Sequence, residues 1–154
     1  MAVERAFRSD IAGFLALASG VESWFGPMVD DPDFHAVLSK NIDRGTAFVV
    51  RGAGTELLGG LLTGGRPPIY RINWLVVGAS SRGQGVGRRL MDYAFSYFER
   101  PCQVEVITFG PDHPAAVESG ARAFYERLGF SPGGDAPTGP EGGTRQRFQL
   151  TLDA

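Results

Sequence analysis

The chain has 154 residues, of which 43% are hydrophobic and 21% are charged, and its formal net charge is −2. That length predicts a single domain, residues 1–154, with a hydrophobic core of its own. Nucleic-acid binders usually carry a basic excess on one face, so this charge argues against that class. The sequence has no run of about 18 apolar residues of the kind that predicts a membrane span.

Cysteine and histidine are scarce in this sequence. Cys102 is the only cysteine, which excludes an intrachain disulfide and suits a reducing compartment. The first residues lack the basic-then-apolar layout of a signal peptide, so we expect a cytoplasmic protein. His35 and His113 are the only histidines and lie far apart, so we expect no metal site. We interpret His113 as a solvated loop residue.

The first half of the chain carries patterns typical of short strands and amphipathic helices. Asp10 suits the N-cap of a helix whose apolar face includes Phe14 and Leu15. Pro32 fits the first position of a second helix, after Asp31. In chain order we predict a strand at 3–8, a helix after Asp10, a helix from Asp31 to Gly45, strands at 46–51 and 57–63, and a break at 64–68.

The second half opens on the strongest strand pattern in the chain. Residues 69–77 are rich in aromatic and β-branched side chains, which favour strands. Hairpins mixed with strand–helix units imply a mixed sheet with helices on its faces. After residue 77 we predict helices at 87–98 and 118–128, strands at 103–109 and 146–152, and a long loop over 131–144, which is dense in glycine and proline.

A glycine-rich turn joins the strand at 69–77 to the helix that follows. It reads Arg82-Gly83-Gln84-Gly85-Val86-Gly87-Arg88, and the first amides of a helix form a site for anions such as phosphate. The turn matches neither common nucleotide-binding motif. A Walker A loop requires Lys-Ser/Thr at the positions of Arg88-Arg89, and a Rossmann fingerprint requires its third glycine at the position of Arg88. On this feature alone, a tight turn without a ligand remains an alternative.

Two motifs together resemble the GNAT superfamily of N-acetyltransferases. The first is an apolar strand end, Leu75-Val76-Val77, followed by Arg82-x-x-Gly85-x-Gly87. The second is Phe124-Tyr125-Glu126-Arg127-Leu128-Gly129-Phe130. They occur in the order and at about the separation found in that family. The resemblance implies an α/β fold of GNAT type, with a mixed, mostly antiparallel central sheet and about four flanking helices. It also implies that the strand at 69–77 splays from the strand at 103–109.

The resemblance assigns a cofactor role to the strand end and to the glycine turn. Acetyl-CoA would be the co-substrate, with its pantetheine held by main-chain groups around Leu75 and Val77 and its pyrophosphate wrapped by the amides of the turn. The residues expected to bind acetyl-CoA are Leu75, Val76, Val77, Arg82, Gly83, Gln84, Gly85, Val86, Gly87 and Arg88.

The resemblance also implies direct attack of an amine on the thioester, with Tyr125 as the acid that protonates the departing thiolate. A packing role for Tyr125 is the alternative. Arg71 and Asn73 stand where relatives often place a base on the strand, and neither accepts a proton at neutral pH. We expect both to contact the acceptor, with Arg71 favouring one that bears an anionic group. An ion pair between Arg71 and a nearby aspartate is an equally compatible role. Glu105 is the best carboxylate candidate for a base, and a salt-bridge role is equally compatible.

We therefore expect an N-acetyltransferase acting on a primary amine of a small molecule, because no acidic groove for lysine-rich partners is evident. Weaker candidates for an apolar acceptor pocket are Trp24, Phe25, Met28, Tyr70 and Trp74. A catalytically idle acyl-CoA-binding module is the alternative function, favoured by the missing base. A nucleotide-binding domain is a third possible function, disfavoured because the glycine turn matches neither the Walker A nor the Rossmann motif. A homodimer is compatible with the sequence, and we expect no nucleic-acid or membrane partner.

Overall fold

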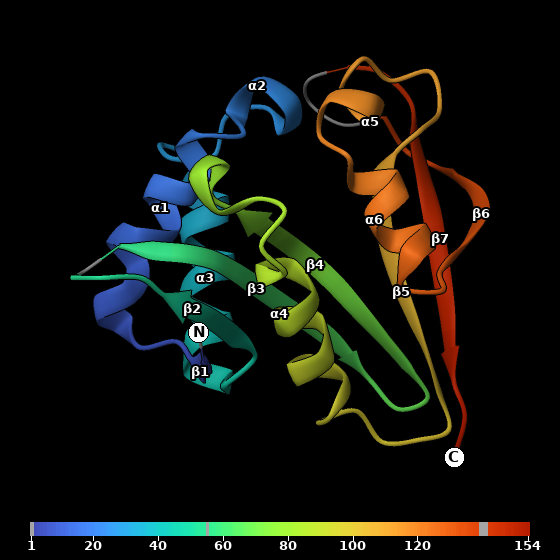
Figure 1. The fold of residues 1–154 in the computed structure, drawn as a ribbon, viewed down its shortest axis with the longest axis horizontal. Helices are drawn as coiled ribbons and strands as arrows, with labels where there is room; N and C mark the ends of the chain where they lie inside the picture. Colours follow the sequence, from blue (N-terminus) through green and yellow to red (C-terminus); the bar gives the residue numbers. More distant parts are fainter. Residues whose placement is uncertain (1, 55, 139–141) are drawn as a thin grey trace.

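The computed structural model describes residues 2–54, 56–138 and 142–154. Within these ranges, seven strands form one sheet in the order β1-β2-β3-β4-β5-β7-β6. Every neighbouring pair is antiparallel except β4 and β5, which run parallel. With helices on both faces (Figure 1), this is the mixed, mostly antiparallel α/β fold that the sequence predicts.

The bounds of the elements follow the chain. The strands are β1 (Val3–Arg5), β2 (Ala47–Arg51), β3 (Leu57–Arg66), β4 (Ile69–Val77), β5 (Cys102–Phe109), β6 (Ser131–Ala136) and β7 (Arg145–Leu152). The helices are α1 (Ile11–Ser19), α2 (Glu22–Phe25), α3 (Pro32–Arg44), α4 (Val86–Phe95), α5 (Ala115–Glu118) and α6 (Ala121–Arg127), with 3-10 turns η1 (Arg8–Asp10) and η2 (Ala79–Ser81). Of the helices described, none has both the length and the hydropathy to span a membrane.

Helices α1 and α3 cover one face of the N-terminal strands (Figure 1). The fully buried Phe14 of α1 and Leu38 of α3 pack in one core cluster with Val49 and Leu62 of the sheet. Helix α3 begins as predicted, because the Asp31 side chain accepts a hydrogen bond from Asp33 N at 2.9 Å. The face predicted for α1 is wrong at one position, since Leu17 is buried and Leu15 only half-buried.

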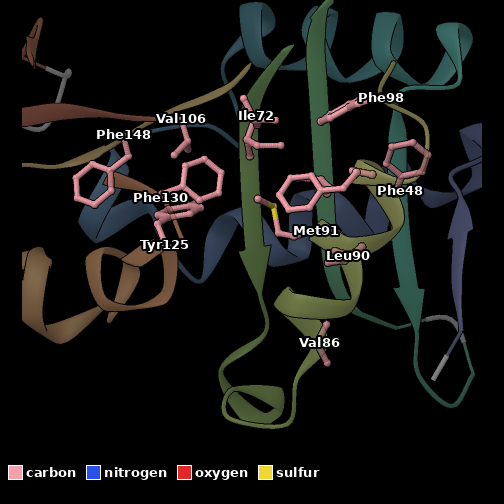
Figure 2. Packing of buried hydrophobic residues seen from close by; sticks show 14 of the residues in the cluster. Phe48, Ile72, Val86, Leu90, Met91, Phe98, Val106, Tyr125, Phe130 and Phe148 are labelled. Carbon is pink, nitrogen blue, oxygen red and sulfur yellow. The ribbon is translucent and has the colours of Figure 1, made fainter. Parts of the chain in front are cut away.

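Helix α4 packs on the opposite face of the sheet. Its Leu90 and Met91 are completely buried, and they share a core cluster with Ile72 of β4, as Figure 2 shows. Burying a side chain of this size stabilises a fold by about 1.5–3 kcal/mol. Helix α6 lies over β5 on the same face, and its Arg122 donates to the Phe109 carbonyl at 2.9 Å. The two helices therefore flank the line along which β4 meets β5.

The pairing between β4 and β5 is short. Only residues 69–72 of β4 face residues 103–106 of β5, and from Asn73 onward β4 has no register with β5 in the described chain. A β-bulge occurs at the same point, because Thr63 faces Ile72 while its neighbour Leu62 faces Trp74. Asn73 is the extra residue. The two strands therefore diverge toward their C-terminal ends, as the family resemblance implied (Figure 1).

Several predicted boundaries are wrong in the C-terminal third. The helix predicted at 118–128 begins three residues later, because α6 starts at Ala121 with Gly120 at its N-cap (φ 70°), and Glu118 is instead the last residue of the separate short helix α5. Part of the predicted loop at 131–144 is strand β6, which pairs with β7 at the edge of the sheet. Residues 139–141 of that loop lie outside the described residues.

Two elements nearer the N-terminus also differ from the prediction. Helix α2 was not predicted, since its single turn is too short to show helical periodicity. The break expected at 64–68 is shorter, because β3 continues through Gly64 and Gly65 to Arg66 and turns at the Pro67–Pro68 pair.

Candidate active site

A cavity of about 430 Å³ lies where β4 leaves β5. Its wall is formed by the end of β4, the glycine-rich turn, the start of α4, the short helix α2, and α6 with the residues just before it. This volume falls in the range of small-molecule sites. The expected acetyl-CoA contacts Leu75, Val76, Val77, Arg82, Gly83, Gly85, Val86, Gly87 and Arg88 all line the cavity.

The main chain of β4 presents hydrogen-bonding groups to this cavity. Opposed residues in an antiparallel pair either exchange two hydrogen bonds or none, in alternation. Gly78 N donates to Leu58 O at 2.8 Å, so the opposed pair Gly59 and Val77 exchanges none. Because the pattern repeats every two residues, the opposed pair Leu61 and Leu75 also exchanges no hydrogen bond. The N–H and C=O groups of Leu75 and Val77 therefore point away from β3, toward the side that β5 has left.

The N-terminus of α4 provides a second set of main-chain donors. Gly83 and Gly85 have φ of 79° and 83°, a left-handed conformation that glycine adopts without strain. No side chain in the described ranges caps this helix, and its first hydrogen bond runs from Arg89 N to Gly85 O at 3.0 Å. The amides of the turn that precede Arg89 are therefore available to an anion, and the helix dipole favours negative charge there.

Arginine side chains add positive charge around the turn. Arg82 Nε donates to the Val77 carbonyl at 3.3 Å, and its guanidinium carbon lies 4.8 Å from the centre of the Trp24 ring. Trp24 Nε1 in turn donates to Glu118 Oε1 at 3.3 Å. Arg88 forms an exposed ion pair with Asp92 at 3.8 Å. The α2 helix is thus joined both to the glycine turn and to α5 across the cavity.

Tyr125 enters the cavity from α6. Its ring packs edge-on against Phe124 and Phe130, with centroids 5.2 and 5.5 Å apart, as Figure 2 shows for Phe130. Burial raises the pKa of the Tyr125 phenol above its usual value, so the hydroxyl stays protonated at neutral pH. That hydroxyl makes no hydrogen bond within the described part of the chain. The position suits a proton donor to a bound molecule.

No aspartate, glutamate or histidine lines the cavity among the described residues. Glu22, close in sequence to Trp24, accepts hydrogen bonds from Met28 N and Val29 N at 2.7 and 3.0 Å, which lower the pKa of its carboxyl. Asp31 is occupied as the cap of α3. The two carboxylates therefore have structural roles, and the cavity wall holds no evident proton acceptor.

Three predicted site residues do not line the cavity. Gln84 lies in the glycine turn, but its side-chain amide donates to the Ser80 carbonyl at 3.3 Å. Arg71 and Asn73 lie on the face of β4 that looks away from α4. Arg71 is paired in register with Glu105, and its Nε lies 3.8 Å from Glu105 Oε2.

Some cavity residues had only a weak signal in the sequence. Of the aromatic residues considered for an acceptor pocket, Trp24 and Phe25 line the cavity. Tyr70 instead stacks on Phe98, with ring centroids 4.1 Å apart, and Trp74 packs against Phe14. Arg127 also lines the cavity and was not predicted. Its position in the second motif, two residues after Tyr125, is the signal that could have identified it.

Comparison with known families and structures agrees with this geometry. Residues 43–132 match the family model of the acetyltransferase (GNAT) domain. The yncA protein of Salmonella typhimurium, described with its cofactor acetyl-CoA, superposes with a TM-score of 0.75 at 18% identity, covering 100% of this chain and 95% of that one. A ribosomal-protein-alanine N-acetyltransferase of Brucella melitensis superposes with a TM-score of 0.74 at 16% identity, covering 99% and 100%. No curated protein matches the sequence.

Proposed function

This chain belongs to the GNAT family of acetyltransferases, and from that membership we propose that it transfers the acetyl group of acetyl-CoA to a primary amine of a small molecule. The observation that carries the proposal is the cavity at the divergence of β4 and β5, where main-chain groups of β4 that are turned away from β3 meet the N-terminus of α4. An elongated molecule with amide groups at one end and a pyrophosphate at the other fits both features.

Each part of acetyl-CoA has a counterpart in this cavity. The pantetheine amides would pair with the free edge of β4 at Leu75 and Val77, in the manner of an added strand. The pyrophosphate would accept hydrogen bonds from the amides of residues 83–88, with Arg82 and Arg88 supplying positive charge. An N–H of β4 near Leu75 would then stabilise the negative charge that develops on the thioester oxygen.

In the reaction that we propose, the amine attacks directly and no covalent enzyme intermediate forms. The amine must be neutral to supply its lone pair. It loses a proton to water as the N–C bond forms, since the described residues of the cavity wall include no carboxylate or imidazole. The C–S bond breaks, and the departing thiolate takes the hydroxyl proton of Tyr125. The Tyr125 phenolate then regains a proton from water, which balances the proton that the amine released. A positioned acid of this kind contributes about 10²–10⁴-fold to a rate.

The test is release of free thiol from acetyl-CoA across a panel of primary amines, together with calorimetry of CoA binding to the protein. We expect CoA to bind, and thiol to appear only when a suitable amine is present. The alternative is an acyl-CoA-binding module without catalysis, which the lack of an acidic or histidine side chain in the cavity wall favours. CoA binding without thiol release from any amine would support that alternative.

A further inference from the structure

Beyond the cavity, the sheet presents an open polar face on the side away from α4 and α6. Ile107 of β5 and Arg147 of β7 are cross-strand partners there, and 47% of Ile107 and 42% of the Arg147 side chain remain exposed. Arg71 on β4 is 61% exposed and lies beside them, across from Glu105. Helices α1 and α3 cover the sheet only as far as the N-terminal strands (Figure 1).

Two guanidinium groups on this face share a single carboxylate. Arg71 Nε and Arg147 Nε lie 3.8 and 3.9 Å from the same oxygen, Oε2 of Glu105. Both distances exceed that of a hydrogen bond, so these contacts are ion pairs only. Neither guanidinium group donates a hydrogen bond to another described residue. The donors of both guanidinium groups therefore remain available, and the three side chains together carry one net positive charge.

This arginine pair lies next to the point where β4 and β5 separate. Ile72 is the last residue of β4 in register with β5, and Arg71 immediately precedes it. Leu75, whose main chain faces the cavity, is four residues further along β4, a distance of about 13 Å at the rise of a strand. A molecule whose amine reaches Leu75 from this face would thus lay its other end over Arg71 and Arg147.

Asn73 lies between these two points and adds a further polar group. It is the extra residue of the β-bulge, and its side-chain nitrogen occupies the space over Gly64, where a Cβ would come within 2.5 Å of Nδ2. Gly64 is the cross-strand partner of Arg71, so the amide and the guanidinium share one face of the sheet.

We propose that Arg71 and Arg147 form the subsite for an anionic group carried by the amine acceptor, either a carboxylate or a phosphate, up to about 13 Å from the reacting nitrogen. This inference rests on the proposed acetyl transfer and adds the substrate class. Guanidinium groups bind both anions with two parallel hydrogen bonds, which the available donors permit. A second ammonium on the acceptor is disfavoured, because it would meet the net positive charge of the cluster.

The experiment compares acceptors that differ only in this charge. Amino carboxylates of increasing chain length are assayed beside their methyl esters, aminoalkyl phosphates and diamines, at saturating acetyl-CoA. We expect a KM about tenfold lower for the best anionic acceptor than for its ester, with little change in kcat. The carboxylate and phosphate series separate the two possible anions. Equal KM values for each acid and its ester would overturn the proposal.

Variants assign the effect to the two arginines. Arg71→Gln and Arg147→Gln should each raise the KM for the anionic acceptor about tenfold and leave the KM for the ester unchanged. Arg44→Gln, an exposed arginine at the end of α3, is the matched control and should change neither. The double variant Arg71→Glu, Arg147→Glu should shift the preference toward diamines. An unaltered preference in that variant would also overturn the proposal.

A binding measurement keeps this inference separate from the proposed reaction. Calorimetry of an N-acetylated amino carboxylate and of its methyl ester, each in the presence of CoA, probes the subsite without turnover. If the ester binds more weakly than the acid, and this difference in affinity disappears in Arg71→Gln, the anion subsite is supported. That holds even if no amine is acetylated, in which case only the proposed reaction fails. Equal binding of acid and ester would reject the subsite whether or not the protein is an active transferase.

Discussion

Tyr125 lines the cavity, and Phe124 and Phe130 pack edge-on against its ring. Replacing Tyr125 with phenylalanine removes only the oxygen, so the ring packing is retained. We expect kcat to fall about tenfold or more, while the Kd for CoA stays within about twofold. Steady-state kinetics with thiol detection and calorimetry with CoA measure the two effects. Unchanged turnover in Tyr125→Phe would leave the residue with a packing role only.

The raised pKa of Tyr125 predicts the shape of the pH profile. A group whose pKa is raised by burial keeps its proton to higher pH than usual, so the acid is present throughout the neutral range and up to at least about pH 10. The amine acceptor, by contrast, gains its lone pair only as pH rises toward its own pKa. We therefore expect kcat/KM to increase with pH and to show no decline between about pH 7 and 10. A bell-shaped profile in that window would indicate a different acid.

Asp10 and His113 show which residue roles the sequence pattern did not reveal. Asp10 is placed correctly at the start of α1, yet its carboxylate accepts hydrogen bonds from Phe7 N and from Arg51, which is 41 positions away in sequence. His113 was expected in solvent, but it is only 8% exposed and its ring lies 4.5 Å from that of Phe109. Both outcomes depend on distant residues, which local patterns do not encode.

Among the elements, the proposed anion-binding role of the turn before α4 can be tested by a glycine-to-alanine substitution. Gly85 and Gly54 both have positive φ, and no atom lies within 4 Å of a Cβ at either position. Alanine should therefore cost each site about 1–2 kcal/mol of stability through backbone strain alone. Only Gly85 lies in the cavity wall, so Gly85→Ala should also raise the Kd for CoA about tenfold. Denaturation and calorimetry on both variants measure this, and equal CoA affinities would contradict the proposed pyrophosphate site.

The elements that were predicted well are those whose signals are local. Strand β4 matches the predicted range of residues 69–77, because six of its nine residues are aromatic or β-branched. Helix α3 matches because Asp31, Pro32 and Gly45 mark its ends. Strand β6 was missed, since its Pro and Gly residues disfavour a strand and only pairing with β7 holds it in place.

The site itself was predictable to a similar degree. The glycine turn and Tyr125 were predicted because their motifs resemble those of GNAT enzymes, and both line the same cavity. Arg147 was missed entirely, because nothing in a strand's sequence says which strand will lie beside it. Its proximity to Glu105 depends on β7 pairing with β5, a contact between segments about 40 residues apart.

At the scale of the whole molecule, the sheet consists of two halves joined along a short seam. Strands β1 to β4 form one half and β5, β7 and β6 the other, and only residues 69–72 of β4 are in register with β5. The cavity wall draws on both halves, from the β4 end and α4 on one side and from α6 on the other. A molecule bound there would add contacts between the halves beyond this seam, where β4 and β5 are not in register.

Binding of CoA should therefore stabilise both halves together. At a free CoA concentration of 100 times its Kd, linkage predicts a gain of about 2.7 kcal/mol in the free energy of unfolding. Thermal denaturation measures that gain, and hydrogen exchange locates it. We expect slower exchange at the amides of the glycine turn and α4, and also in β5 and α6, which lie across the seam. Protection confined to α4 would mean that CoA binds the helix end without entering the cavity, and the assignment of Leu75, Val77 and Tyr125 to the site would fail with it.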